Sequence, residues 1–218
     1  MRTTNLTDPS APFHGVRWDP DQPIVVSIAS TGGVVSLAFA RFQRHQPRDL
    51  EGLPRYTIGY ERISNTGKLD TDTVGLLEAR LAQWEPHADV ITGHGLEAQL
   101  KVLRAAAAAP DRLPSLSGLA QRWPLRFLRV AGLRPQLLDT AADIDGAHED
   151  LVRTCAADPR LHSLYLTPGG DDPRVPITAA VASVLLAARH MGWCSWQLLD
   201  LDAVITASSD RLWWAGSW

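Results

Sequence analysis

The 218-residue chain predicts an α/β protein with one mixed sheet flanked by helices. Three observations support this fold class. First, the segment 23–63 carries three apolar or alternating runs separated by short turns, which is typical of an antiparallel meander. Second, residues 71–109 follow the order helix, strand, helix, which favours a strand that pairs in parallel. Third, the run "PITAAVASVLLAARHMGW" (176–193) predicts a long apolar helix.

Each expected strand of the meander has its own pattern. "PIVVSIAS" (23–30) is apolar and β-branched, as in a buried strand, and the turn "TGG" leads into "VVSLAFARF" (34–42). "RYTIGYERI" (55–63) alternates between two kinds of side chain, which is typical of a third strand. These runs predict a hairpin extended by one more antiparallel strand.

Beyond the meander, helices are predicted where apolar residues recur with a helical period. The predicted helices are 71–85, 95–109, 116–123, 146–157 and 176–193. A strand is predicted at 88–92, and a strand that enters a turn at 135–144. We expect residues 1–22 to form a flexible N-terminal arm and 23–192 to form the folded domain. Residues 193–218 are expected to form a C-terminal extension, a helix with an aromatic end, packed on that domain.

Composition and charge narrow the function. Hydrophobic residues make up 45% of the chain, charged residues 21%, and the formal net charge is −3. A protein that coats nucleic acid needs an excess of positive charge, so that class is disfavoured. Cys155 and Cys194 form no metal-binding motif, and we expect reduced thiols. No apolar run is as long as a membrane span and no signal peptide is recognisable, so we expect a cytoplasmic protein without a membrane partner.

Two motifs at strand ends resemble the DEDD 3′–5′ exonucleases, the DnaQ-like family of the ribonuclease-H-like fold. In that family an apolar strand carries Asp-x-Glu before Thr-Thr-Gly, and a second motif reads Gly-His-Asn with an Asp-Leu pair after it. The residues of "VVSIASTGG" and "GHGLEAQL" that match are Val26, Thr31, Gly32, Gly93, His94, Leu96 and Leu100. "LLDTAADI" (137–144) is similar to a third family segment, Val-Asp-Thr. The resemblance covers roughly residues 23–192 and implies a three-stranded antiparallel meander joined by parallel strands.

The same resemblance implies a two-metal nuclease site, but its acids are missing. Ser27, Ala29 and Gln99 stand at three of the carboxylate positions, and 173–199, where the fourth is expected, contains no Asp or Glu. Mg²⁺ requires hard, preferably anionic oxygen ligands. We therefore predict a site without catalytic residues, metals or cofactors, in a protein that binds nucleic acid or nucleotide or acts as a scaffold.

An active exonuclease with displaced acids is the alternative. Asp139, Asp143 and Asp172 would then hold Mg²⁺ or Mn²⁺. Helix capping and loop solvation explain Asp172 without a metal, and a structural role explains Asp139.

Basic residues between 98 and 136 favour a nucleic-acid ligand, since the only acid there is Asp111. The predicted contacts to single-stranded nucleic acid or nucleotide are Thr31, His94, Lys101, Arg104, Arg122, Arg126 and Arg129. Two other interpretations stay open: His94 is a core or turn histidine, and the arginines cover solvent faces and pair with acids in 139–150.

Aromatic residues gather at the C-terminal end. Trp213, Trp214 and Trp218 either pack on the domain or contact a protein partner or a second copy of the chain. A protein-interaction subunit, such as a homodimer formed through these residues, is therefore the second alternative function.

Overall fold

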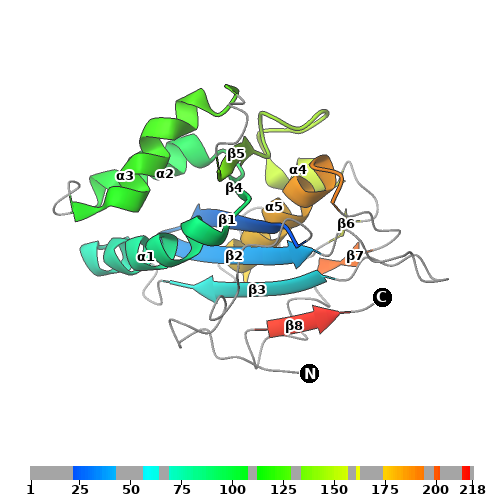
Figure 1. Cartoon of the computed structure of the whole chain (residues 1–218), viewed down its shortest axis with the longest axis horizontal. Coiled ribbons are helices and arrows are strands. Elements are labelled where there is room, and N and C mark those ends of the chain that lie inside the picture. The colour runs from blue at the N-terminus through cyan, green and yellow to red at the C-terminus, as the bar shows by residue number, and fades with distance from the viewer. Residues whose placement is uncertain are drawn as a thin grey trace.

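The chain contains one main sheet with helices on both faces (Figure 1). The computed structural model describes residues 22–42, 56–63, 69–107, 112–128, 134–156, 161–162, 174–193, 199–201 and 213–216. The strands of the main sheet are β1 (Ile24–Thr31), β2 (Val34–Phe42), β3 (Tyr56–Arg62), β4 (Val90–Gly93), β5 (Gln136–Asp139) and β8 (Trp213–Gly216). Their order in space is β5-β4-β1-β2-β3-β8.

The sheet is mixed, as the sequence predicts. β1, β2 and β3 are antiparallel neighbours, with Ser27 opposite Ala38 and Ala38 opposite Tyr60. β4 pairs in parallel with the other side of β1, and β5 pairs in parallel with β4. The meander and the parallel strands therefore meet at β1, which lies in the interior of the sheet.

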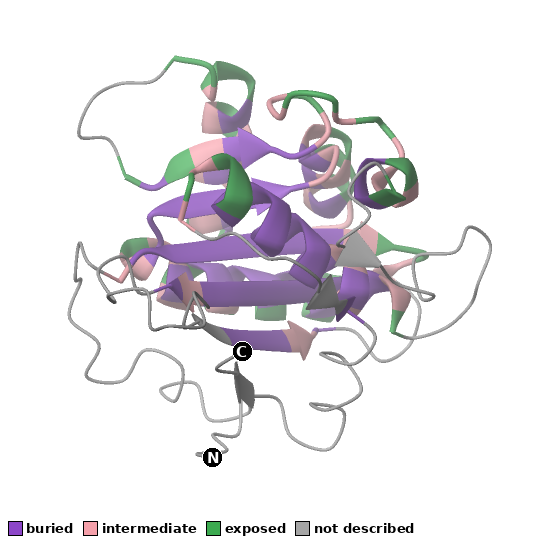
Figure 2. Cartoon of the chain, turned by 90° about the vertical axis from the view of Figure 1, so that its right-hand side faces the viewer, coloured by how far each residue is buried: buried purple, intermediate pink, exposed green. Residues whose placement is uncertain are grey.

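Helices cover the two faces of this sheet. On one face lie α1 (Thr71–Trp84), α2 (Leu96–Ala105) and α3 (Pro114–Arg122), and on the other lies α5 (Val175–His190). Short 3-10 turns, η1 (Glu85–His87) and η3 (Trp123–Leu125), follow α1 and α3. Figure 2 shows that the central strands are buried between these layers.

The alternation of side chains along β1 divides the core into two halves. Val26 and Ile28 join the cluster under α1, α2 and α3, where Phe39 meets Trp84 edge-on at 5.4 Å between ring centroids. Val25 and Ala29 join the cluster under α5. Because α5 is apolar on all sides, it is buried along nearly its whole length.

The strand entering a turn that the sequence predicts at 135–144 is confirmed. β5 ends at Asp139, where the chain turns and the backbone N–H groups of Ala142 and Asp143 bond the carbonyl oxygen of Asp139. One helix differs from the prediction. The predicted helix 146–157 is reduced to α4 (Leu151–Ala156), since Gly146 adopts a positive φ of 73° in the turns before it.

The C-terminal extension contributes a strand to the sheet. β8 pairs antiparallel with β3, with Trp213 opposite Gly59 and Trp214 opposite Ile58. A second, two-stranded sheet joins β6 (Leu161–His162) to β7 (Leu199–Asp200). Trp213 and Trp214, which the sequence suggests as contacts to a partner, thus extend the main sheet through their backbones. Trp218 and the predicted arm, apart from Gln22, lie outside the described residues.

Candidate functional site

Ser27 and Ala29 sit inside the sheet rather than in an open cleft. Both face α5, and both are buried. The Ser27 hydroxyl donates a hydrogen bond of 2.5 Å to the carbonyl oxygen of Ala180 on α5. An alanine and a serine in this environment pack the helix against β1. Neither supplies an anionic oxygen.

Gln99 holds two elements together through its carboxamide. Its Oε1 accepts the backbone N–H of Ser30 at 2.8 Å, and its Nε2 donates to the carbonyl oxygen of His94 at 2.9 Å. The amide therefore joins the end of β1 to the corner between β4 and α2. A carboxylate could accept the first bond but has no hydrogen for the second, so an amide suits this place better than an acid.

The corner before α2 depends on two glycines. A Cβ on Gly93 would lie 2.8 Å from the backbone oxygen of Ile28 and 2.9 Å from the Cβ of Leu96, which is too close. Gly95 has a φ of 61° and caps α2 in the left-handed conformation. These glycines let the strand and the following helix approach each other closely.

His94 is tied into the fold by both ring nitrogens. Nε2 lies 3.0 Å from the carbonyl oxygen of Glu149, and Nδ1 lies 3.0 Å from the hydroxyl of Thr140. A carbonyl can only accept, so we assign the ring hydrogen to Nε2. The single hydrogen of the Thr140 hydroxyl then has two acceptors within reach, His94 Nδ1 at 3.0 Å and the carbonyl oxygen of Gly93 at 3.3 Å, and we assign it to the nearer. Burial lowers the pKa of His94 below its ordinary value, which favours this neutral form, while nearby Asp139 and Asp150 act in the opposite direction.

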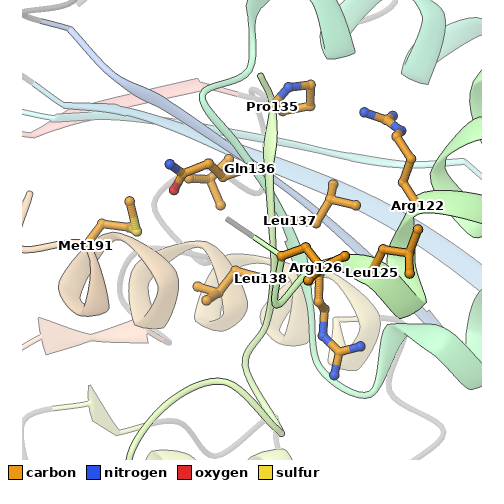
Figure 3. A pocket seen from close by; sticks show the side chains of 10 residues that line it. Arg122, Leu125, Arg126, Pro135, Gln136, Leu137, Leu138 and Met191 are labelled. Atoms are coloured by element: carbon orange, nitrogen blue, oxygen red, sulfur yellow. The ribbon is translucent and has the colours of Figure 1, made fainter. Parts of the chain in front are cut away.

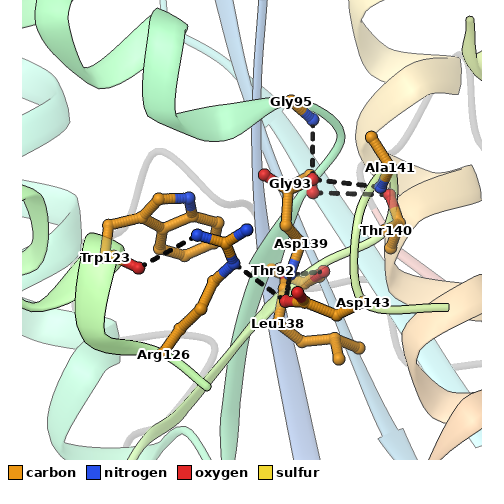
Figure 4. Close-up of polar contacts among 10 residues, drawn as sticks. All are labelled: Thr92, Gly93, Gly95, Trp123, Arg126, Leu138, Asp139, Thr140, Ala141 and Asp143. Atoms are coloured by element: carbon orange, nitrogen blue, oxygen red, sulfur yellow. Dashed lines mark hydrogen bonds and ion pairs between the residues drawn. The ribbon is translucent and has the colours of Figure 1, made fainter. Parts of the chain in front are cut away.

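Asp139 and Asp143 lie next to each other, but their oxygens bind N–H groups (Figure 4). Asp139 Oδ1 accepts the backbone N–H of Gly95 at 2.8 Å and of Ala141 at 3.0 Å. Asp143 Oδ2 accepts the backbone N–H of Asp139 at 2.7 Å and Nε of Arg126 at 2.9 Å. Asp139 thereby replaces the side-chain cap that α2 lacks.

A relocated metal site is not assembled in the described part of the chain. There, no group of three or more His, Cys, Asp or Glu side chains is placed to hold a metal ion. Asp172, the third acid of the alternative, lies outside the described residues. The structure brings Asp139 and Asp143 together for a turn and an ion pair.

Most of the predicted basic contacts are paired with acids. The ion pairs in this region are Lys101–Glu97 at 3.0 Å, Arg122–Glu85, Arg126–Asp143 at 2.9 Å and Arg134–Asp89 at 2.7 Å. Only the Arg126 pair uses an acid from 139–150. Arg104 is half-buried, Thr31 is exposed at the β1–β2 turn, and Arg129 lies outside the described residues. Pairing lowers the positive charge that this face offers to a phosphate.

An open hollow lies beside the carboxylate positions. It is lined by Ser30, Gly32, Gly33, Leu69, Ala98, Gln99 and Val102, and has a volume of about 390 Å³. None of these lining residues carries a charge. The hollow therefore offers backbone and amide groups, but no cation, to a ligand.

A second pocket, lined mainly by apolar side chains, lies at the opposite end of the main sheet from β8, along β5 (Figure 3). Its volume is about 200 Å³. The lining residues are Val90, Arg122, Leu125, Arg126, Leu128, Pro135, Gln136, Leu137, Leu138 and Met191. Sequence reasoning missed this pocket, because its walls come from η3, β5 and the end of α5, which are distant along the chain.

Comparisons of the chain with protein-family models, with curated proteins and with solved structures give no match. In the described part of the chain, no helix combines the length and the apolar character needed to cross a membrane.

Proposed function

We propose that this protein is a catalytically inactive relative of the DEDD exonucleases, a ribonuclease-H-like domain that serves as a binding or scaffolding module. The strand order supports the fold part of the proposal. Three antiparallel strands are followed by two parallel strands on the other side of β1, with helices on both faces. Gly95 also supports it, because the family's asparagine at this position and glycine are the residues that tolerate its left-handed conformation.

One observation carries the loss of catalysis: the side chains at the expected carboxylate positions are neutral and are occupied with internal contacts. Ser27 bonds Ala180, Ala29 packs in the core, and Gln99 bridges Ser30 and His94. The part of α5 that meets Ser27 carries an alanine, so the fourth side likewise offers no acid.

Electrostatics explains why neutral groups are insufficient. Two dications about 4 Å apart repel each other by about 4 kcal/mol even at the dielectric constant of water, and by more in a partly buried site. Carboxylates offset this repulsion, whereas a hydroxyl, a methyl group and an amide do not. Under this proposal, the protein binds no metal pair beside Ser27, Ala29 and Gln99.

The binding role favours a protein partner over nucleic acid. Lys101, Arg122 and Arg126 already pair with acids, and the hollow beside Gln99 has no charged lining residue. Large apolar side chains are instead exposed on the turn after α3, where Leu125 is 54% and Phe127 70% exposed. Exposed apolar groups of this kind gain most from a protein surface.

A metal titration and a nuclease assay test the proposal together. Calorimetry with Mn²⁺ should show no saturable two-site binding, and labelled single-stranded DNA and RNA should stay intact with Mg²⁺ or Mn²⁺. Tight two-site binding would overturn it. Cleavage that survives purification and disappears in Asp139→Asn would favour the displaced-acid exonuclease instead.

A titration with single-stranded oligonucleotides separates the two binding roles. Fluorescence anisotropy at low and moderate salt should show weak binding that vanishes as salt is raised, because few unpaired cations are available. Tight binding that weakens in Lys101→Ala and Arg104→Ala would instead support nucleic acid as the ligand.

A further inference from the structure

The outer edge of β5 is open to an additional strand. β5 is the terminal strand of the sheet, and its only strand neighbour in the described part of the chain is β4. The N–H of Gln136 donates to Asp89 at 2.9 Å and that of Thr140 to Gly93 at 3.0 Å, so alternate residues turn toward β4. The N–H and C=O of Leu137, and the C=O of Pro135, must therefore point outward.

The outward backbone groups of Leu137 lack a hydrogen-bond partner among the described residues, whereas the outward N–H of Asp139 has one. The outward N–H of Asp139 is covered by the Asp143 carboxylate at 2.7 Å. Among the described residues, nothing bonds the N–H or C=O of Leu137. An open edge with a free donor and a free acceptor is the feature to which an extended peptide adds in β-augmentation.

The apolar pocket lies directly on this edge. Leu125 and Leu128, from the turn after α3, both line it. Leu125 lies on one side of β5, and Met191 from the end of α5 lies on the other (Figure 3). Leu125 is 54% and Leu128 56% exposed, so the two leucines present apolar surface to solvent beside the pocket. The pocket of about 200 Å³ has room for one large apolar side chain.

Both charged residues among the described lining residues are arginines, and each has spare donors. Arg126 uses Nε for Asp143 and Nη1 for the carbonyl oxygen of Trp123, while Arg122 uses Nε for Gly118 and Nη2 for Glu85. No described group bonds Nη2 of Arg126 or Nη1 of Arg122. Although each arginine already pairs with an acid, its remaining N–H donors can still bind a carboxylate oxygen of a ligand.

We propose that this β5-edge groove, formed by Leu125, Leu128, Leu137, Met191 and the two rim arginines Arg122 and Arg126, binds an extended peptide segment of another protein. The peptide pairs with the open groups of Leu137. It places one large apolar side chain between Leu125 and Leu128. Residues i and i+2 of a strand share a face, so an Asp or Glu two positions away meets the arginine rim.

The proposal goes beyond the inactive-nuclease proposal and is independent of it. The groove lies along β5, whereas the carboxylate positions belong to β1 and α2. A positive metal titration would therefore leave the groove intact, and a failed peptide experiment would leave the metal argument intact.

The experiment uses the full chain and a library of short random peptides displayed on phage. Selection should enrich peptides with a large apolar residue two positions from an Asp or Glu. One enriched peptide is then synthesised, labelled and titrated by fluorescence anisotropy. Its Glu→Lys or Asp→Lys version should bind about 10-fold more weakly, equivalent to about 1.4 kcal/mol.

Variants of the protein locate the site. Leu128→Asp should weaken the peptide at least about 10-fold, while Leu76→Asp, on an equally exposed leucine of α1 (54%), should change the affinity less than about twofold. Amide hydrogen exchange provides a second measurement. The peptide should protect the N–H of Leu137 and leave that of Gln136 unchanged, since Gln136 already bonds Asp89.

Four results of the peptide experiments overturn the proposal. They are a selection without enrichment, enrichment of basic peptides, binding that Leu128→Asp does not weaken, and binding without protection of the Leu137 amide. Light scattering tests whether a second copy of the chain occupies the groove instead. A dimer of the chain that Leu128→Asp dissociates would assign the groove to a second copy and would also overturn the proposal.

Discussion

Replacing Gln99 by glutamate tests why this position holds an amide. The glutamate can still accept the Ser30 N–H, but it cannot donate to the carbonyl oxygen of His94 at 2.9 Å. A buried acceptor left without a donor costs about 1–3 kcal/mol, and the half-buried position favours the lower part of that range. A negative charge in the first turns of α2 returns about 0.3–1 kcal/mol through the helix dipole. We expect Gln99→Glu to lose about 1 kcal/mol.

Urea unfolding followed by circular dichroism measures this loss, and a thermal melt should fall by roughly 2–4 °C. The matched control is Gln121→Glu on the exposed face of α3, which should change stability by less than about 0.5 kcal/mol. A protonated carboxyl regains a donor. The difference between Gln99→Glu and the wild type should therefore shrink as the pH falls toward about 4.

Two results would refute this reasoning. Equal stability of Gln99→Glu and the wild type at neutral pH would mean that the bond to His94 contributes nothing. Recovery of the lost stability on adding Mn²⁺ would mean that a single acid restores metal binding, since a ligand stabilises the state that binds it.

Three further predictions concern the residues that hold the corner and the helices. Gly93→Ala should destabilise the protein by about 1–3 kcal/mol, because the added Cβ would lie 2.8 Å from the backbone oxygen of Ile28. In the same denaturation assay, the control Gly75→Ala on α1, where an added Cβ has no atom within 4 Å, should stabilise the protein by about 0.5–1 kcal/mol. Because the pKa of His94 is lowered in the folded protein, the unfolded chain takes up a proton on this residue first as the pH falls. The contribution of His94 to the free energy of unfolding is therefore complete above pH about 6.5 and declines below that value. Chemical denaturation at several pH values should show a decline in the free energy of unfolding in the wild type and a smaller one in His94→Gln, and equal declines would contradict the prediction. Glu78→Ala should cost about 1–3 kcal/mol and expose the start of α3 to hydrogen exchange, because both oxygens of Glu78 accept backbone N–H groups there at 2.8 Å, and unchanged exchange would show that the cap is dispensable.

Local patterns explain how much of the fold was predictable. β-branched runs and the turn "TGG" determine β1 and β2, and the helical period of apolar residues determines α1, because each signal lies within a few residues along the chain. The helix predicted at 146–157 was too long, because hydrogen bonds from side chains to the backbone compete with the helix at its start. Its early residues bond one another in turns, where the His148 N–H donates to Thr154 Oγ1 and the Val152 N–H to Asp150 Oδ1.

The candidate site was predictable only in part. Gln99 and His94 do meet at one corner, together with Ser30 at the end of β1, whereas Ser27 faces α5. Motif spacing did not indicate that Gln99 bonds the His94 carbonyl or that His94 bonds the 139–150 region. Nor did it reveal that Arg122 and Arg126 pair with Glu85 and Asp143. Those contacts join residues 17 and 37 positions apart, and a sequence pattern holds no information on which distant groups meet.

By itself, the sequence determined the alternation of strands and helices and the absence of acids at residues 27, 29 and 99, because these depend on residue type and short-range period. Only the tertiary structure decided that an amide bridges β1 to the corner before α2, that Lys101, Arg122 and Arg126 each pair with an acid, and that an apolar pocket lies along the open edge of β5. Each of these requires the chain to close loops and bring side chains from separate elements within bonding distance, and those distances exist only after the sheet has assembled.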